Sequence, residues 1–238
     1  MKVMRATKGP RLWVALDGLT TKQSETIAKA NQLHKEVEGD YGFKINLDFV
    51  LQSGIEEAIA LLPRRPIFVD LKMWNGARTM AQVFCDLNHA GVFATNAYAF
   101  AGDELAKAIR VFREKTQGRS ALRIYAVTIL THYNDVYTMR LWVKILRELV
   151  PELVSEGIKA GADGVIVPGT TLRVLGPEVC KIMPGLRPAW YHRDDRHEQE
   201  YTPEDIVGRL DVEAVCGGPI MNNDDPVAAL RRILREIE

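Results

Sequence analysis

Residues 66–72 read Pro-Ile-Phe-Val-Asp-Leu-Lys, a short apolar run that closes on two charged residues, and Met-Trp-Asn-Gly-Ala-Arg-Thr follows at residues 73–79. Alternation along a strand places Asp70 and Lys72 on one face and Leu71 on the other. A carboxylate and an ammonium group side by side at the carboxyl end of a strand are costly to desolvate unless each is paired. The pair is therefore either a structural ion pair at the rim of a barrel or part of a network that a substrate completes.

Strand-like and helix-like segments alternate on both sides of this stretch. We predict strands at residues 12–17, 43–46, 67–72, 92–97, 123–130, 164–168, 180–183 and 214–217. We predict helices at residues 20–38, 79–89, 102–115, 136–160 and 226–237. Eight strands, each followed by a helix, indicate a parallel (β/α)8, or TIM, barrel. The alternative is an open doubly wound sheet, but the glycine-rich dinucleotide turn of that fold is absent after residues 12–17.

The composition is typical of a globular enzyme and excludes several other classes. The chain has 238 residues, a length that suits one barrel, and no linker divides it, so we expect a single domain over residues 1–238. Its 31 basic and 31 acidic residues give a net charge of +0, which favours neither nucleic acid nor an anionic membrane. No apolar stretch is long enough to span a bilayer, and the start lacks the apolar core of a signal peptide. Cys85, Cys180 and Cys216 are widely spaced in apolar sequence, which favours reduced thiols in a cytoplasmic protein over a disulfide framework or a zinc site.

Charged residues recur at the carboxyl ends of the first three predicted strands. Asp17 ends the first strand, Lys44 lies in the second, and Asp70 and Lys72 end the third. Two carboxylates and two ammonium groups at one mouth of a barrel form an alternating network, in which each cation offsets the desolvation of a neighbouring anion. One such residue is a weak signal, but four at matching strand ends indicate a site.

Residues 70–79 resemble the Asp-x-Lys-x-x-Asp signature of the orotidine 5'-monophosphate decarboxylase family. Asp70, Lys72 and the closing Thr79 match, whereas Asn75 stands where the family has its second Asp. The resemblance covers nearly the whole chain through further matching segments at residues 126–131, 160–165, 184–188, 201–205 and 217–220. It therefore implies the same barrel fold and a related activity.

The resemblance implies catalysis without a cofactor on a nucleotide monophosphate. Asp70 would lie next to the carboxylate that leaves as carbon dioxide, and Lys72 would protonate the carbanion at C6 of the pyrimidine. Lys44 and Asp17 would hold the ribose hydroxyls and complete the charge network. In the family the second Asp reaches the active site of the partner subunit. The expected assembly is therefore a homodimer in which Asn75 and Thr79 project toward the neighbouring pocket.

The remaining substrate contacts implied by the resemblance are only partly retained. Thr131 corresponds to the element that contacts the pyrimidine, and Arg187 lies in a Pro-Gly-Leu-Arg-Pro segment close to a family motif. The family's Gly-Arg pair at the last strand is replaced by Gly217-Gly218, and its loop glutamine aligns with Arg196. Arg196 would then bind phosphate from the loop while the amides of Gly217 and Gly218 complete the contact. The alternative is that Arg196 lies on a solvated charged loop.

The loop at residues 190–201 and His132 each have a structural as well as a functional interpretation. The loop at residues 190–201 carries several histidines and carboxylates, but their spacing fits no standard ligand motif, so we expect no metal site. His132 follows Thr131 and replaces a small hydroxyl residue of the family. It is either a contact to an unusual substrate or a histidine at the barrel rim.

Three functions remain open from the sequence. The first is an orotidine 5'-monophosphate decarboxylase with an altered motif, favoured by the joint presence of Asp17, Lys44, Asp70 and Lys72. The second is a related lyase acting on another phosphorylated sugar or nucleotide. The third is a binding protein that keeps the pocket but has lost efficient chemistry. Asn75 and Gly218 favour the second and third; the metal-dependent sugar-phosphate branch of the family carries an acidic residue where this chain has Lys44.

Overall fold

A computed structural model describes residues 9–16, 23–192 and 200–238. Its strands are all parallel and close into a barrel in the order of the sequence, which confirms the predicted fold. The strands are β1 (Leu12–Ala15), β2 (Tyr41–Asn46), β3 (Ile67–Met73), β4 (Ala94–Tyr98), β5 (Arg123–Val127), β6 (Gly164–Ile166), β7 (Lys181–Pro184) and β8 (Val212–Cys216). Each lies within a few residues of a predicted strand. Asp17 and residues 20–22 of the first predicted helix lie outside the described residues.

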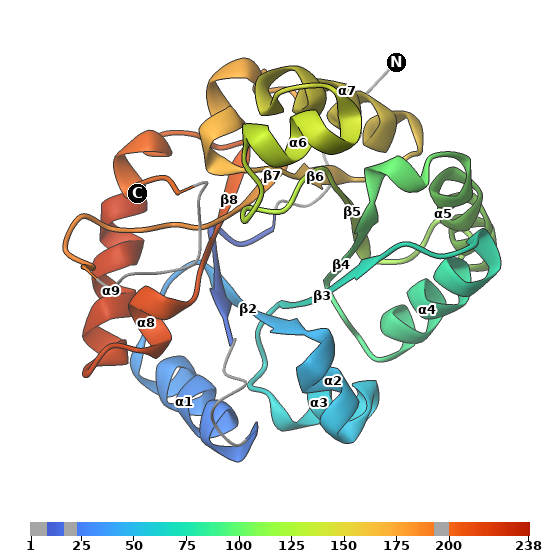
Figure 1. Ribbon diagram of the computed structural model, residues 1–238. Helices are drawn as coiled ribbons and strands as arrows, with labels where there is room; N and C mark the ends of the chain where they lie inside the picture. Colours follow the sequence, from blue (N-terminus) through green and yellow to red (C-terminus); the bar gives the residue numbers. More distant parts are fainter. Residues whose placement is uncertain (1–8, 17–22, 193–199) are drawn as a thin grey trace.

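The helices form an outer layer around the strands (Figure 1). They are α1 (Gln23–Glu36), α2 (Leu47–Ser53), α3 (Ile55–Leu61), α4 (Ala77–His89), α5 (Asp103–Lys115), α6 (Asp135–Trp142), α7 (Leu146–Lys159), α8 (Gly218–Met221) and α9 (Pro226–Ile237). Short 3-10 turns are η1 (Ala99–Ala101), η2 (Gly169–Val174) and η3 (Pro203–Asp205). Within the described residues, β6 is followed by η2 and β7 by η3, each in place of the α-helix expected after every strand. None of the described helices has the length and apolar character needed to cross a bilayer.

The helix predicted at residues 136–160 is wrong, because the structure divides it into α6 and α7. The break falls at Val143, whose left-handed φ of 58° ends α6. Asp135 stabilises the new start by accepting a hydrogen bond from the backbone N–H of Leu146 at 2.8 Å. The helices α2 and α3 between β2 and β3 were not expected. Their exposed apolar residues, such as Leu47 and Leu51, blur the helical periodicity.

Two apolar layers hold the barrel. The larger lies between the strands and the helices, and the smaller fills the barrel interior. Trp13, Phe68 and Tyr125 dominate the interior layer, and the rings of Trp13 and Phe68 meet edge to face at 5.6 Å. Glu213 lies in the same interior, where it accepts hydrogen bonds from the indole of Trp13 at 2.9 Å and the hydroxyl of Tyr125 at 3.1 Å. These side chains fill the barrel interior, and a site can form above them at the carboxyl end of the strands.

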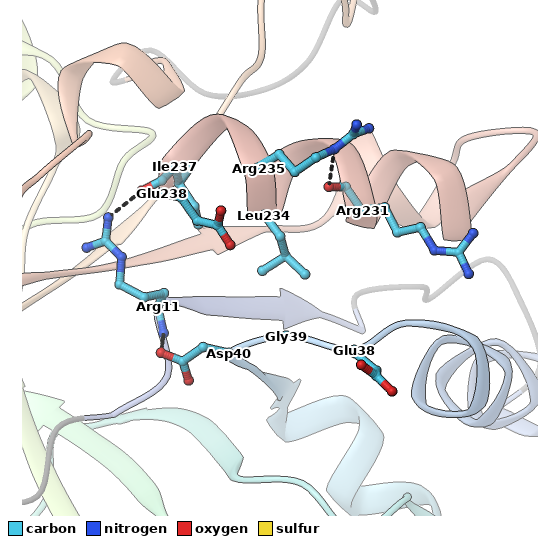
Figure 2. Close-up of a pocket in the computed structure, with 9 residues that line it drawn as sticks. All are labelled: Arg11, Glu38, Gly39, Asp40, Arg231, Leu234, Arg235, Ile237 and Glu238. Atoms are coloured by element: carbon cyan, nitrogen blue, oxygen red, sulfur yellow. Dashed lines mark hydrogen bonds between the residues drawn. The ribbon is translucent and has the colours of Figure 1, made fainter.

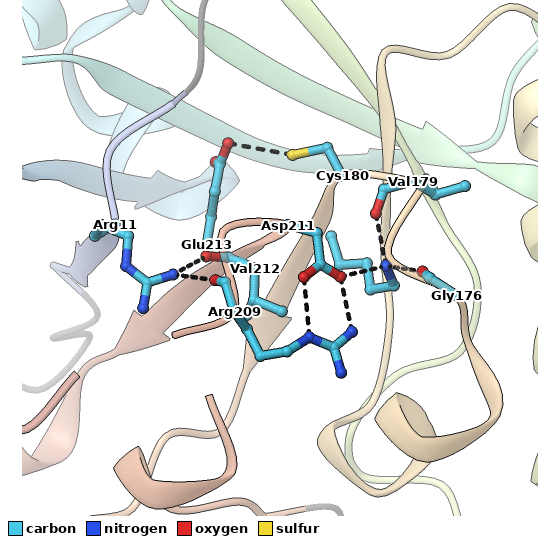
Figure 3. Close-up of polar contacts among 9 residues, drawn as sticks. Arg11, Gly176, Val179, Cys180, Arg209, Asp211, Val212 and Glu213 are labelled. Carbon is cyan, nitrogen blue, oxygen red and sulfur yellow. Dashed lines mark hydrogen bonds and ion pairs between the residues drawn. The ribbon is translucent and has the colours of Figure 1, made fainter. Parts of the chain in front are cut away.

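Ionic contacts close the amino end of the barrel (Figure 3). Lys181 is fully buried and donates to Asp211 at 2.8 Å and to the carbonyl groups of Gly176 and Val179, both at 2.6 Å. Asp211 is also bound by Arg209 at 2.8 Å. Burial alone would raise the pKa of the Asp211 carboxyl, but hydrogen bonds from Arg209 and Lys181 outweigh that and lower its pKa to about 2. Each charged side chain of this network is paired with an opposite charge, so we assign the network a structural role at this end of the barrel.

Arg11 joins this end of the barrel to α9. Its guanidinium donates to the carbonyl groups of Arg209, of Val212 at 2.9 Å and of Ile237 at 2.7 Å. Figure 2 shows the pocket beside it, which Arg235 also lines; among the described residues, the Arg235 side chain donates to the carbonyl group of Arg231. Arg11 therefore ties together segments that are far apart in sequence.

Arg11→Ala is expected to lower the free energy of unfolding by about 2–4 kcal/mol, because several carbonyl groups lose a charged donor at once. Urea denaturation followed by circular dichroism measures the change. Arg235→Ala is the matched control from the same pocket and should shift stability by no more than about 0.5 kcal/mol. Equal losses for the two variants would contradict the special role of Arg11.

Candidate active site

The carboxyl ends of β2 and β3 bring three charged side chains together. In the parallel register Asn46 lies opposite Asp70, which places Lys44 one step deeper in the barrel. The Nζ atoms of Lys72 and Lys44 lie 2.6 Å and 3.4 Å from the same Asp70 oxygen, Oδ2. Lys44 also donates to Asn46 Oδ1 at 2.5 Å. The cluster of Asp70, Lys44 and Lys72 predicted from strand ends is therefore present.

Asp70 is held as a carboxylate. Burial would raise the pKa of its carboxyl, but the positive charges of Lys44 and Lys72 and the hydrogen bonds from Lys72 and Asn96 outweigh burial, so the pKa lies below its ordinary value. With Lys44 and Lys72 protonated, the cluster carries one net positive charge. A cluster of this sign favours an anionic ligand.

The backbone between Asp70 and Lys72 departs from a regular strand. Val69 pairs with Thr95 and Met73 pairs with Ala97, so three residues of β3 stand opposite the single residue Asn96. Lys72 has φ 50°, a left-handed conformation that is uncommon for a residue with a side chain. The side chains nevertheless alternate as the sequence predicts, because Asp70 and Lys72 both face the barrel mouth whereas Leu71 packs against the apolar layer outside the strands.

A pocket of about 360 Å³ opens above the cluster. Its floor is apolar, with Phe68, Val127 and Ile166 among the residues that line it. The predicted site residues that line it are Lys44, Asp70, Lys72, Thr131, Arg187, Gly217 and Gly218. An apolar floor below a few convergent charges suits a flat ring that bears anionic groups.

Arg187 supplies a further cation at the mouth of this pocket. Its side chain is 10% exposed and lies 3.6 Å from Glu200, and its guanidinium lies over the Tyr191 ring at 5.7 Å. Arg187 lies in the segment that leaves β7, which turns at Gly185, where the φ of 97° favours a glycine. Gly217 and Gly218 line the pocket where the neighbouring strand β8 ends and α8 begins.

Two predicted residues do not line this pocket, and two others fall outside the described residues. Asn75 and Thr79 are exposed, on the loop after β3 and in the first turn of α4, and neither lines the pocket within one chain. Asp17 and Arg196 lie outside the described residues, as does most of the histidine- and carboxylate-containing loop. Within the described parts of the chain, no three His, Cys, Asp or Glu side chains gather closely enough to hold a metal ion.

Sequence reasoning missed two asparagines in the site. Asn46 contacts Lys44, and Asn96 contacts both Asp70 and Lys72. Both lie at or near the carboxyl ends of predicted strands, at residues 43–46 and 92–97, so the position that revealed the charged residues would also have revealed them. His132 lines the pocket and is exposed, which places it at the rim.

Similarity to known proteins is consistent with this geometry. The sequence profile of the Orotidine 5'-phosphate decarboxylase / HUMPS family matches residues 10–233. An orotidine 5'-phosphate decarboxylase of Moorella thermoacetica is 33% identical over 208 residues, which cover 82% of this chain and 81% of the relative. The enzyme of that name from Pelobacter propionicus is 30% identical over 202 residues, covering 82% and 83%.

Solved structures with the same fold include two of similar length. An orotidine 5'-phosphate decarboxylase from Lactobacillus acidophilus superposes with a TM-score of 0.71 at 24% identity, covering 96% of this chain and 99% of the other. An uncharacterized conserved protein from Geobacillus kaustophilus superposes with a TM-score of 0.72 at 20% identity, covering 95% and 100%. At these identities the likeness concerns the fold.

Proposed function

Because the chain belongs to the orotidine 5'-phosphate decarboxylase / HUMPS family, we propose that it is a carboxy-lyase that converts orotidine 5'-monophosphate to UMP in pyrimidine biosynthesis, without a cofactor. The observation that carries this proposal is the Asp70 carboxylate, held between the ammonium groups of Lys72 and Lys44 at 2.6 Å and 3.4 Å at the base of the pocket. The arrangement offers both a repulsive charge and a proton donor to one bound ring.

The chemistry follows from these three groups. The Asp70 carboxylate repels the carboxylate of the substrate, and binding energy from the ribose and phosphate offsets that repulsion. The bond between C6 and the carboxyl carbon breaks, carbon dioxide leaves, and the electron pair stays on C6. Lys72 donates a proton to C6 and regains one from solvent, while its positive charge stabilises the carbanion as it forms. Lys44 keeps Asp70 charged throughout.

Turnover of orotidine 5'-monophosphate tests the proposal directly. Purified protein should deplete the absorbance of the orotate ring and form UMP, which chromatography identifies. Orotidine without phosphate should react far more slowly, because remote phosphate binding drives the step. Tight UMP binding without turnover would instead favour a nucleotide-binding protein with impaired chemistry, the alternative that Asn75 and Gly218 support.

We assign the phosphate to the side of the pocket formed by Arg187, Gly217 and Gly218. Arg187 is the described cation nearest the end of β7, and its planar guanidinium suits bidentate contact with phosphate oxygens. Binding would draw Arg187 from its contact with Glu200, which is itself 41% exposed and can remain in solvent. Arg196 remains a proposed second contact.

Arg187→Met is expected to weaken UMP binding by about tenfold to a hundredfold and to leave uridine binding unchanged, because only the nucleotide bears the phosphate. Calorimetry with the two ligands measures both affinities. Arg173→Met, at an exposed arginine in η2, should change neither. The same ligand pair tests Arg196→Ala. Equal weakening of UMP and uridine would dismiss a phosphate role for the altered residue.

A homodimer is also proposed, with the carboxyl face of the barrel in the interface. Apolar side chains are exposed there although a folded chain usually covers such groups: Trp74 is 68%, Val136 78% and Val143 77% exposed. They adjoin a chain of aromatic contacts in which Phe100 packs on Trp74 at 4.8 Å and on Trp142 at 6.3 Å. Asn75 follows Trp74 directly, so a second copy covering this face would receive it.

Trp74→Glu should convert the dimer to a monomer, because a carboxylate in an apolar interface is costly to bury. Light scattering at micromolar concentration measures the mass. Leu210→Glu is the control: Leu210 is 74% exposed but precedes β8, at the opposite end of the barrel, and its replacement should leave the dimer intact. A wild-type monomer, or a dimer that survives Trp74→Glu, would contradict this interface.

A further inference from the structure

The pairing of β3 with β4 contains a bulge at the point where the charged cluster lies. Val69 and Thr95 are paired, as are Met73 and Ala97, but Asp70, Leu71 and Lys72 stand opposite Asn96 alone. The backbone groups of these three residues cannot all find ladder partners on β4. Lys72 accordingly adopts a left-handed φ of 50°, a conformation that a lysine adopts only when its surroundings impose it.

The side chain of Asn96 makes the contacts that hold Lys72 in this left-handed conformation. Its side-chain Oδ1 accepts a hydrogen bond from the backbone N–H of Lys72 at 2.6 Å, and its Nδ2 donates to Asp70 Oδ1 at 2.7 Å. The chemistry fixes this orientation, since a backbone N–H only donates and a carboxylate only accepts. Asn96 is 0% exposed, so water does not compete for either bond. We call these two bonds the Asn96 clamp.

The clamp acts on both reacting partners at once. Asp70 Oδ1 is committed to Asn96, so the other oxygen, Oδ2, faces the two ammonium groups. The backbone of Lys72 is held in its left-handed state, which directs the side chain back toward Asp70. One buried amide therefore sets the distance between the proposed repulsive carboxylate and the proposed proton donor.

We propose that Asn96 is a positioning residue for the decarboxylation, acting through the backbone of Lys72 and the carboxylate of Asp70. The kinetic part of this inference rests on the proposed function. The clamp itself is a property of the free protein. Because Asn96 does not line the pocket, its loss should impair the step in which the proton is donated more than the binding of nucleotide.

The kinetic test compares Asn96→Ala and the smaller polar replacement Asn96→Ser with wild type. Loosening of a reacting group by about 1 Å costs roughly a hundredfold in rate, so we expect kcat to fall about a hundredfold while KM changes little. Asn96→Asp gives the charge test. It can still accept from Lys72 but sets a carboxylate oxygen against Asp70 Oδ1, so the two acids compete for a proton and the acid limb of the kcat profile should move to higher pH.

Thr95→Val is the matched control. Thr95 lies next to Asn96 on β4, is equally buried at 0% exposure, and also bonds β3, donating from Oγ1 to the carbonyl group of Val69 at 3.0 Å. Its bond lies outside the bulge. Its bond reaches neither Asp70 nor Lys72, so we expect kcat within about threefold of wild type. Equal losses of kcat in Thr95→Val and Asn96→Ala would reduce Asn96 to a structural residue and overturn the proposal.

Hydrogen exchange gives a readout that does not depend on turnover. In isotope-labelled protein the Lys72 amide should exchange slowly, and Asn96→Ser should accelerate its exchange by about tenfold or more while Thr95→Val leaves it unchanged. If wild type fails to turn over orotidine 5'-monophosphate, the proposed function fails while this measurement still decides the clamp. Unchanged protection of the Lys72 amide in Asn96→Ser, or a kcat unaffected by Asn96→Ala, would overturn the inference.

Discussion

Lys72→Met is expected to reduce turnover of orotidine 5'-monophosphate by about a hundredfold to ten-thousandfold, the usual range for removing a positioned general acid. The variant lacks both the proton donor for C6 and a positive charge 2.6 Å from Asp70. Asp70 keeps Lys44 and Asn96 as partners, so the pocket should survive the change. Steady-state kinetics, together with UMP binding by calorimetry, measures the two effects separately.

The expected pattern is a large loss in kcat with UMP affinity hardly changed, because UMP carries a hydrogen at C6 and makes no use of the donor. Lys159→Met is the matched control. Lys159 forms an ion pair of 2.9 Å with Glu156, but its side chain is 69% exposed on α7, and its replacement should leave kcat unchanged. If Lys72→Met kept wild-type turnover, the proton would have to come from another group or from water.

The fold was accessible from the sequence because its signals are local. Short apolar runs bounded by polar residues located the strands, and their alternation with helices specified a parallel barrel. The convergence of Lys44, Asp70 and Lys72 followed from the topology, since all strands of such a barrel end at one face. These predictions needed only the order of the elements.

The details that fix the geometry of the site were not local. The bulge at residues 70–72 depends on the register between β3 and β4, and nothing in the sequence of either strand alone specifies that three residues face Asn96. The break at Val143 was missed for a different reason, since a β-branched residue does not by itself predict a left-handed end of a helix.

Asn75→Asp is expected to raise turnover by about tenfold or more, since each tenfold corresponds to about 1.4 kcal/mol of the barrier. With Lys44 and Lys72 protonated and Asp70 ionised, the cluster of these three residues carries one net positive charge. A second carboxylate would restore neutrality, give Lys72 another partner and set another repulsive charge beside the substrate carboxylate. Kinetics with orotidine 5'-monophosphate compares the two forms. Asn31→Asp, the same change at an exposed position on α1, is the control and should have no effect.

Asn75 is exposed and lies away from the pocket of its own chain, so a second experiment tests whether residue 75 acts in the pocket of the partner subunit. If Asn75 serves the partner's pocket, the double variant Lys72→Met/Asn75→Asp should be inactive alone. Co-expressed with wild type, it should still raise the activity of the hybrid dimer, because it offers a carboxylate to an intact Lys72 across the interface. A hybrid no more active than wild type would place residue 75 in its own pocket. A wild-type rate already typical of an efficient enzyme, falling when Asp is introduced at position 75, would show that Asn75 is an adapted part of the site rather than a loss.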